Sequence, residues 1–254
     1  MSLSSTTTPD PPRSAPAFIP LEANPPVLTD LAHKLGLSQA LQMHDVWSTE
    51  PELIATMQIP RPALALLVVF PLTAPYESER LAEDAGAEEY SGVGDDEPVL
   101  WWKQTIRNAC GMMGLLHAVA NGSAREYIEP NSTFDKLIKT SLPLPPHARS
   151  ALLEQTPELA CAHQEAASGT SNSTTAPDAQ DDVDLHYVCF VKTEKDGGTL
   201  WALDGRRKGP VALGKLDAGE DVLSDKALLL GPVKILQHAG NDLRASCVAL
   251  AGAN

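Results

Sequence analysis

The sequence is poor in cysteine, in long apolar runs and in basic residues, and each shortage argues against a class of protein. Four cysteines in 254 residues, with no CxxC pair, argue against a zinc site and for a reduced intracellular protein. The longest apolar run, Ala63 to Phe70, has eight residues, whereas a membrane span needs roughly 20. The first ten residues lack the apolar core of a secretory signal. With 19 basic residues against 33 acidic ones, nucleic acid is an unsuitable partner. We therefore expect a cytoplasmic protein, with the nucleus as a second location.

The chain is long enough for one substantial domain, which we place at residues 18–254. Residues 1–17, rich in proline, serine and threonine, are expected to form a disordered tail. His33 and His44 are placed in an N-terminal helical region, and Cys189 and Cys247 on strands, as core residues. Apolar periodicity and turn residues predict helices near 27–35, 51–57, 134–142, 146–167 and 225–238, and strands at 63–70, 183–191, 199–206 and 245–250.

The most informative stretch, WWKQTIRNACGMMGLLHAVANG, runs from Trp101 to Gly122 and places a cysteine just ahead of an apolar helix. Helical spacing of apolar residues begins at Met113, so Cys110 lies at or near the helix N-terminus. The unpaired N–H groups and the dipole there stabilise a thiolate, the nucleophilic form of cysteine. Gln104 could add a side-chain N–H that holds an oxyanion. The alternative interpretation is that Cys110 is a small core residue.

A cysteine nucleophile needs a base, and among seven histidines only His186 has a carboxylate placed to orient it. His117 is nearer in sequence but lies two helical turns, roughly 10 Å, from Cys110. His186 is on an expected strand, and Asp204 ends the next strand after a KDGG turn. In an antiparallel hairpin, the residue numbers of opposed partners have a constant sum, which for this pair is 186 + 204 = 390. His186 and Asp204 should therefore be neighbours, within a register shift of a residue or two. The alternative is an ordinary hairpin with a surface histidine and a turn aspartate.

Several stretches resemble the short ubiquitin C-terminal hydrolases, a family of papain-like cysteine peptidases. They are FIPLEANPPVL, PRPALALLVVFPLT, QTIRNACG followed by MGLLHAVAN, VDLHYVCFV, LWALDGR and DLRASCVAL, in the family's order from about Phe18 to Leu250. The resemblance implies an α/β (α+β) fold with a central antiparallel-rich sheet flanked by helices. It also implies a crossover loop over the active site. The implied catalytic residues are Cys110 as nucleophile, His186 as general base and then acid, Asp204 as its orienting carboxylate, and Gln104 as oxyanion donor.

The resemblance also implies a surface that binds ubiquitin, with the protein acting as a monomer and needing no metal or cofactor. Taken alone, Leu21 is better explained as a packing residue. The implied contact residues are Pro20, Leu21, Glu22, Ala23, Asn24, Leu185, Asp242, Leu243 and Arg244.

Residues 77–97 contain nine acidic side chains and one arginine, Arg80. We interpret this segment as a solvated acidic loop. The alternative is that it attracts a basic partner, such as the C-terminal tail of ubiquitin.

The patterns predict a thiol-dependent hydrolase, and the resemblance implies that it removes small adducts or short extensions from the C-terminal glycine of ubiquitin. The size limit comes from residues 168–182, which are expected to form a mobile loop and match a family segment that crosses the active-site cleft. A flexible loop of 182 − 168 + 1 = 15 residues spans roughly 20 Å, less than the ~30 Å of a small domain. Two alternatives stay open: the same chemistry on a ubiquitin-like modifier, and an inactive ubiquitin-binding module.

Overall fold

The computed structural model describes residues 16–168, 184–240 and 242–253. Its centre is an antiparallel sheet of six strands in the order β1-β6-β2-β3-β4-β5. This order brings a strand from each end of the chain together at one edge, where β1 pairs with β6. The strands are β1 (Leu41–Val46), β2 (Ala65–Pro71), β3 (Leu185–Thr193), β4 (Thr199–Leu203), β5 (Val211–Lys215) and β6 (Ser246–Gly252).

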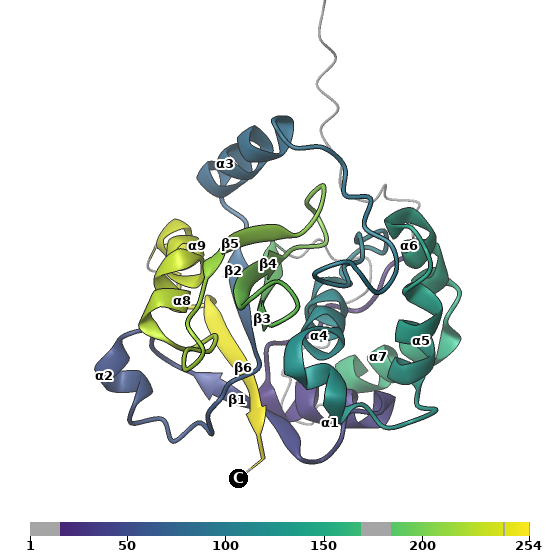
Figure 1. Cartoon of the computed structure of the whole chain (residues 1–254), viewed down its shortest axis with the longest axis horizontal. Helices are drawn as coiled ribbons and strands as arrows, with labels where there is room; N and C mark the ends of the chain where they lie inside the picture. Colours follow the sequence, from purple (N-terminus) through teal and green to yellow (C-terminus); the bar gives the residue numbers. More distant parts are fainter. Residues whose placement is uncertain (1–15, 169–183, 241, 254) are drawn as a thin grey trace, which may run out of the picture.

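Helices cover both faces of the sheet (Figure 1). On one side lie α1 (Pro25–Leu35), α4 (Cys110–Ala120), α5 (Thr133–Ser141), α6 (Pro146–Glu154) and α7 (Pro157–Ser168). On the other side lie α8 (Asp225–Leu230) and α9 (Pro232–Ala239). Three further helices are α2 (Pro51–Ile54), α3 (Ala74–Ala85) and the 3-10 helix η1 (Gly122–Tyr127).

The central strand β2 shows why the sheet has two cores. Its side chains alternate between faces, so Ala65 and Leu67 pack with the α1 and α4 side, whereas Leu66 and Val68 pack with the α8 and α9 side. Every residue of β2 is consequently buried. The prediction of a central strand covered on both faces is confirmed.

Two edge strands were not predicted. His44 lies on β1, not in a helical region, because residues 41–46 pair with β6 and bury Leu41, Met43 and Val46. At the other edge, β5 pairs with β4 across an irregular register. Edge strands bury less side-chain area than central ones, which leaves a weaker apolar pattern in the sequence.

The prediction of a solvated acidic loop is wrong for the two ends of the segment, whereas Glu88, Glu89, Asp95 and Asp96 are exposed and lie outside helices and strands, as predicted. Its first part is the helix α3, which begins after Thr73, whose side-chain oxygen accepts from the Tyr76 N–H at 3.4 Å. Its last acid, Glu97, is 6% exposed and forms an ion pair with the buried Arg149 at 2.6 Å. Glu97 therefore has a specific arginine partner elsewhere in the fold.

The described chain begins inside the predicted tail. The Arg107 N–H donates to the Pro16 carbonyl, the Phe18 N–H donates to the Arg107 carbonyl, and Ala17 forms a parallel bridge with Arg107. The rest of the predicted tail, residues 1–15, lies outside the described residues. So does the predicted loop, except for Ser168, which ends α7.

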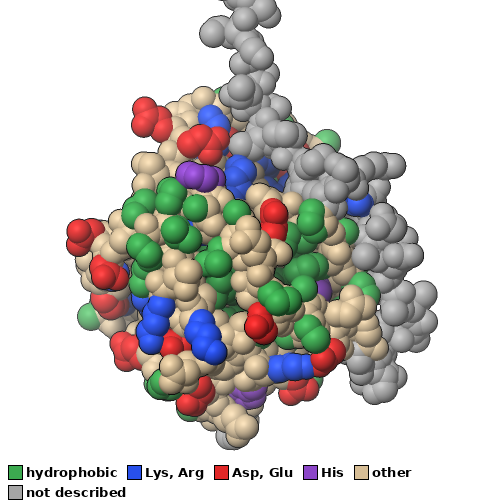
Figure 2. Space-filling model, turned by 90° about the vertical axis from the view of Figure 1, so that its right-hand side faces the viewer, with side chains coloured by type: hydrophobic (Ala, Val, Ile, Leu, Met, Phe, Trp, Pro, Cys, Tyr) green, Lys and Arg blue, Asp and Glu red, His purple; other side chains and the backbone are tan. Residues whose placement is uncertain are grey.

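Charges are mixed on the surface drawn in Figure 2, where hydrophobic side chains gather near the middle and acidic and basic ones lie around and between them.

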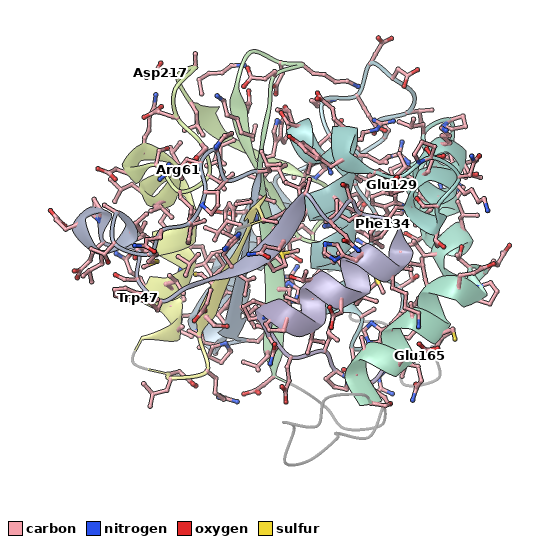
Figure 3. All side chains as sticks on the ribbon, turned by 90° about the horizontal axis from the view of Figure 1, so that it is seen from below. Trp47, Arg61, Glu129, Phe134, Glu165 and Asp217 are labelled. Atoms are coloured by element: carbon pink, nitrogen blue, oxygen red, sulfur yellow. The ribbon has the colours of Figure 1, made fainter. Side chains whose placement is uncertain are left out.

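The large aromatic side chains are mostly inside. Trp102 and Phe134 are completely buried, and the Trp102 indole N–H donates to Ser141 Oγ at 3.2 Å. Trp47 is the contrast, at 59% exposure, and Figure 3 places it at the outer edge of the molecule. The hydrogen bond to Ser141 anchors Trp102 to the end of α5.

Candidate active site

Cys110 is the first residue of α4 and is half-buried. Two residues earlier, Asn108 has a φ of 56°, a left-handed conformation that asparagine tolerates better than most residues. The chain therefore turns directly into the helix and leaves the thiol at its N-terminus. Gly111 permits a close approach, because a Cβ there would lie 3.0 Å from Leu21 Cβ. The predicted position of the thiol at a helix start is confirmed.

His186 and Asp204 form a buried pair beside this thiol. His186 Nε2 lies 2.8 Å from Asp204 Oδ1, and both side chains are at most 3% exposed. Since Asp204 occupies Nε2, the other ring nitrogen, Nδ1, is the one left for Cys110. Burial alone would lower the pKa of His186, but Asp204 and the neighbouring Cys110 raise that pKa to about 9. Asp204 and Cys110 therefore favour the protonated imidazole.

The carboxylate of Asp204 is held in its ionised form. Burial would raise the pKa of Asp204, but His186 and hydrogen bonding from Arg206 hold that pKa well below its usual range. The Arg206 backbone N–H donates to Asp204 Oδ1 at 2.8 Å. An ionised carboxylate against the imidazole fixes both the orientation and the charge of the ring.

The hairpin brings His186 and Asp204 together in a register two residues from the predicted one. Cys189 pairs with Leu203, so partner numbers sum to 189 + 203 = 392 rather than 390. β4 also ends at Leu203, whereas the predicted strand ran to Arg206. Asp204 therefore reaches the ring from the start of the turn. The two side chains are neighbours, as predicted, and the surface-histidine alternative is wrong.

Gln104 is fixed to the turn that follows Asp204. Its backbone N–H donates to the Gly205 carbonyl at 2.9 Å, and its side-chain Nε2 donates to the Ile106 carbonyl at 3.2 Å. A Cβ at Gly205 would lie 2.9 Å from Gln104 Cβ, so glycine permits this contact. The buried Gln104 Oε1 has no hydrogen-bond partner among the described residues. Because the amide group carries two N–H bonds, a second donor is available for an oxyanion.

His117 of α4 and Asn121, which directly follows this helix, hold the segment that carries Gln104. Asn121 accepts from the Leu100 N–H at 2.7 Å and donates to the Leu100 carbonyl at 2.9 Å. His117 Nε2 accepts from the Trp102 N–H at 3.2 Å. Burial lowers the pKa of His117 to about 4, so the ring is a neutral acceptor. His117 is a structural residue, in agreement with its predicted distance from the thiol.

Cys110 opens onto a groove of about 980 Å³. Its sulfur lies 3.8 Å from the Leu185 carbonyl, which is also at the groove. The predicted contact residues in the lining are Pro20, Leu21, Glu22, Ala23, Asn24, Leu185, Leu243 and Arg244. Two segments about 220 residues apart in sequence thus meet beside the thiol.

Two predicted contact residues have a second structural role. Leu21 is 6% exposed and packs in the core, while its carbonyl accepts from the Tyr187 hydroxyl at 2.7 Å. Asp242 does not line the groove, but it holds Arg244 through an ion pair of 2.7 Å. Arg244 also pairs with Asp184 at 2.8 Å. The packing interpretation of Leu21 and its place at the groove are therefore compatible.

Sequence reasoning missed part of the groove. Met43, His44 and Asp45 of β1 line it, as does Tyr187. The alternation of apolar Leu41 and Met43 with polar Gln42 and His44 was the sequence signal for β1, and Tyr187 directly follows His186 on a strand. No group of three potential metal-ligating side chains occurs in the described ranges. Over the same residues, no helix is long and apolar enough to cross a bilayer.

Comparisons with known proteins identify the family. Residues 18–230 match the model described as "Ubiquitin carboxyl-terminal hydrolase, family 1". The chain is 33% identical over 202 residues to ubiquitin carboxyl-terminal hydrolase 3 of Arabidopsis thaliana, covering 79% of this chain and 81% of that one. It is 30% identical over 232 residues to ubiquitin carboxyl-terminal hydrolase YUH1 of Saccharomyces cerevisiae, covering 89% and 91% of the two chains.

A solved structure shares the fold. The catalytic domain of Trichinella spiralis UCH37 bound to ubiquitin vinyl methyl ester matches with a TM-score of 0.68 at 18% identity, covering 95% of this chain and 99% of that one. The predicted papain-like fold class, with an antiparallel-rich sheet flanked by helices, is confirmed. The family model spans 230 − 18 + 1 = 213 of 254 residues, and the chain belongs to the ubiquitin carboxyl-terminal hydrolase family 1.

Proposed function

We propose that this protein hydrolyses amide, ester or thioester bonds at the C-terminal glycine of ubiquitin, with Cys110 as nucleophile. The observation that carries the proposal is the 2.8 Å pair of His186 and Asp204 beside a thiol at the start of α4. Relatives with the name ubiquitin carboxyl-terminal hydrolase support ubiquitin as the substrate. So does the shared fold of a hydrolase domain bound to a ubiquitin derivative.

The reaction has two steps. The Cys110 thiolate attacks the glycine carbonyl, and the oxyanion is held by a Gln104 N–H and the Cys110 backbone N–H. His186 gives its proton to the leaving amine, alcohol or thiol, and a thioester between Cys110 and ubiquitin remains. The now neutral His186 takes a proton from water, and the hydroxide attacks the thioester to release ubiquitin and the thiolate. Asp204 stays ionised throughout and orients the ring.

Substrate affinity comes from the groove. The C-terminal tail of ubiquitin is basic, and the groove presents the carboxylates of Glu22 and Asp45 near the thiol. Leu243 is fully exposed at the groove and offers an apolar contact. Opposite charges raise the association rate, and the apolar side chain adds buried area on binding. The protein acts as a monomer in the cytoplasm, with the nucleus as a second location.

The leaving groups are small adducts and short C-terminal extensions. This part of the proposal rests on the sequence alone, because the segment on which it depends lies outside the described residues. Cleavage of a ubiquitin–peptide fusion should exceed cleavage of folded diubiquitin. Equal rates on the two substrates would remove the size limit and leave the chemistry unaffected.

The proposed activity is tested by release of a fluorophore from the C-terminus of ubiquitin, measured beside one ubiquitin-like protein. Cys110→Ala should abolish release while ubiquitin still binds, because affinity comes from a surface far larger than one thiol. Turnover within tenfold of the wild type would refute Cys110 as the nucleophile. Binding without turnover by the wild type would favour an inactive ubiquitin-binding module. Faster release from the ubiquitin-like protein would favour the other modifier.

A further inference from the structure

The buried face of α3 is polar, which is unusual for a helix at the edge of a domain. Its buried residues are Tyr76, Arg80 and Asp84, at intervals of four, with exposures of 8%, 4% and 6%. A helix normally buries an apolar stripe and turns its charges to solvent. A buried arginine and aspartate are costly unless they have specific partners. The partners of this stripe lie in and beside the turn that begins with Asp204.

Tyr76 contacts the catalytic carboxylate directly. Its hydroxyl donates to Asp204 Oδ2 at 3.4 Å, while Oδ1 is the oxygen that faces His186. The Tyr76 ring packs edge-on against Phe70, with 4.7 Å between the ring centroids. The Phe70 ring packs edge-on against His186, with 5.9 Å between the centroids. The two oxygens of Asp204 are therefore held from two sides, one by the histidine and one by α3.

Arg80 and its neighbours hold the turn itself. Arg80 Nη1 donates to the Arg206 carbonyl and to Asp84 Oδ2, both at 3.3 Å. Glu77 accepts from both Arg80 and Arg206, at 3.1 to 3.3 Å. Asp84 also accepts from Arg207 Nε at 3.1 Å. Two consecutive arginines after the Asp204–Gly205 pair are thus fixed to carboxylates of α3.

The opposite side of the turn is fixed as well. The Trp101 indole N–H donates to the Asp204 carbonyl at 3.1 Å, and the Gln104 N–H donates to the Gly205 carbonyl at 2.9 Å. These contacts come from the segment that carries the oxyanion donor. The turn is therefore clamped between α3 on one side and the segment 101–104 on the other.

We propose that the polar stripe of α3 holds Asp204 in place against His186, so that Tyr76 and Arg80 are positioning residues for hydrolysis. This inference rests on the proposed function, in which Asp204 orients the base. It also assigns a purpose to the acidic part of the sequence. Glu77 accepts from Arg80 and Arg206, and Asp84 accepts from Arg80 and Arg207, so these two acids hold the turn. Removing either positioning residue should lower kcat and leave ubiquitin binding unchanged, because none of these side chains lines the groove.

The test compares Tyr76→Phe and Arg80→Met with Arg61→Met in the fluorophore-release assay. Arg61 is the control because it forms a two-point pair with one carboxylate, that of Asp221, with both contacts at 2.5 Å, as Arg80 does with Glu77. Asp221 otherwise accepts from the Ala63 and Leu223 N–H groups. We expect kcat to fall on the order of tenfold in Arg80→Met and severalfold in Tyr76→Phe, since small displacements of a catalytic group are costly. KM should stay within about twofold in both, because the groove is intact. The control should keep the wild-type kcat.

A double-mutant cycle separates positioning from general stability. In an Asp204→Ala background, neither Tyr76→Phe nor Arg80→Met should lower kcat further by more than about twofold, because the group they position is gone. The same loss in both backgrounds, or a wild-type kcat in both single variants, would overturn the inference. Tyr76→Phe removes only a hydroxyl and decides the matter if Arg80→Met does not fold. If Asp204→Ala alone kept full activity, the proposed role of Asp204 would fail instead.

Discussion

His117 on α4 and His186 on β3 are both almost inaccessible to solvent, at 1% and 2% exposure, yet their pKa values shift in opposite directions. Burial lowers the pKa of His117 to about 4, while Asp204 and Cys110 overcome burial and raise the pKa of His186 to about 9. The first ring accepts from a backbone N–H, and the second contacts a carboxylate. The partner, and not the depth, decides which histidine can carry a proton in catalysis.

The comparison also explains how one helix serves two purposes. His117 holds the segment that carries Gln104, and Cys110 at the other end of α4 faces His186. A neutral ring suits the first task, because a protonated one could not accept the Trp102 N–H. A protonated ring suits the second, because it stabilises the thiolate and then supplies a proton to the leaving group.

The largest difference between the two histidines is expected in turnover. His186→Ala removes the proton donor and base, so kcat/KM should fall roughly 10³-fold or more. His117→Ala leaves the base in place, and the folded protein should remain active. Asp204→Ala should be milder than His186→Ala, because the carboxylate only orients the ring. The measurement is fluorophore release from ubiquitin, with circular dichroism to confirm folding. If the loss of His117 silenced a folded protein and the loss of His186 did not, the assignment would be reversed.

The pH profile should show the role of the carboxylate. In the wild type, the protonated His186 is lost as pH rises through about 9, so kcat/KM should have an alkaline limb there. In Asp204→Ala, burial still disfavours the charged ring but the carboxylate no longer raises its pKa. The alkaline limb should therefore move to lower pH by at least about one unit. An unchanged limb in Asp204→Ala would mean that another group sets it.

A smaller effect is expected on stability at the other histidine. His117→Ala leaves the buried Trp102 N–H without its acceptor, which should lower the free energy of unfolding by about 1–3 kcal/mol. His117→Gln keeps a side-chain acceptor and should recover part of that loss. Urea unfolding of the three proteins gives the comparison. If glutamine and alanine were equally destabilising, the hydrogen bond to Trp102 would not be the cause.

The smallest effect should come from the exposed edge of the groove. Arg244, whose side chain is 51% exposed, pairs with Asp184 and Asp242, and solvent and salt screen such pairs. Arg244→Ala should change KM by about two- to fivefold and leave kcat unchanged. The difference in KM should shrink as ionic strength increases. A fall in kcat would give this side chain a role in the chemistry that its position does not predict.

The sequence predicted the elements whose signals are local. The α4 start at Cys110 and the buried strand β2 follow from the periodicity of apolar residues and from a continuous apolar run. The neighbouring positions of His186 and Asp204 followed from hairpin spacing, although the register was two residues off. A strand end is set by the next turn, and the hydrogen bonds of that turn to α3 and to residues 101–104 are not visible in spacing.

Elements that depend on distant partners were missed. The α3 stripe of Tyr76, Arg80 and Asp84 has helical spacing but no apolar residue other than tyrosine. It is stable because Arg206 and Arg207 arrive from more than 120 residues away. The edge strand β1 depends in the same way on pairing with β6 at the far end of the chain. Only the folded structure supplies these partners.

The central claim, that Cys110 is the thiol that attacks the ubiquitin C-terminus, has a direct test in covalent capture. Ubiquitin with a C-terminal vinyl methyl ester should form one adduct with the protein, and peptide mass spectrometry should locate it on Cys110. Cys161 is an internal control, because it is exposed but lies outside the groove, while Cys189 and Cys247 are buried. We expect the adduct to disappear in Cys110→Ala and to form much more slowly in His186→Ala. An adduct on Cys161, or one that persists in Cys110→Ala, would contradict the claim.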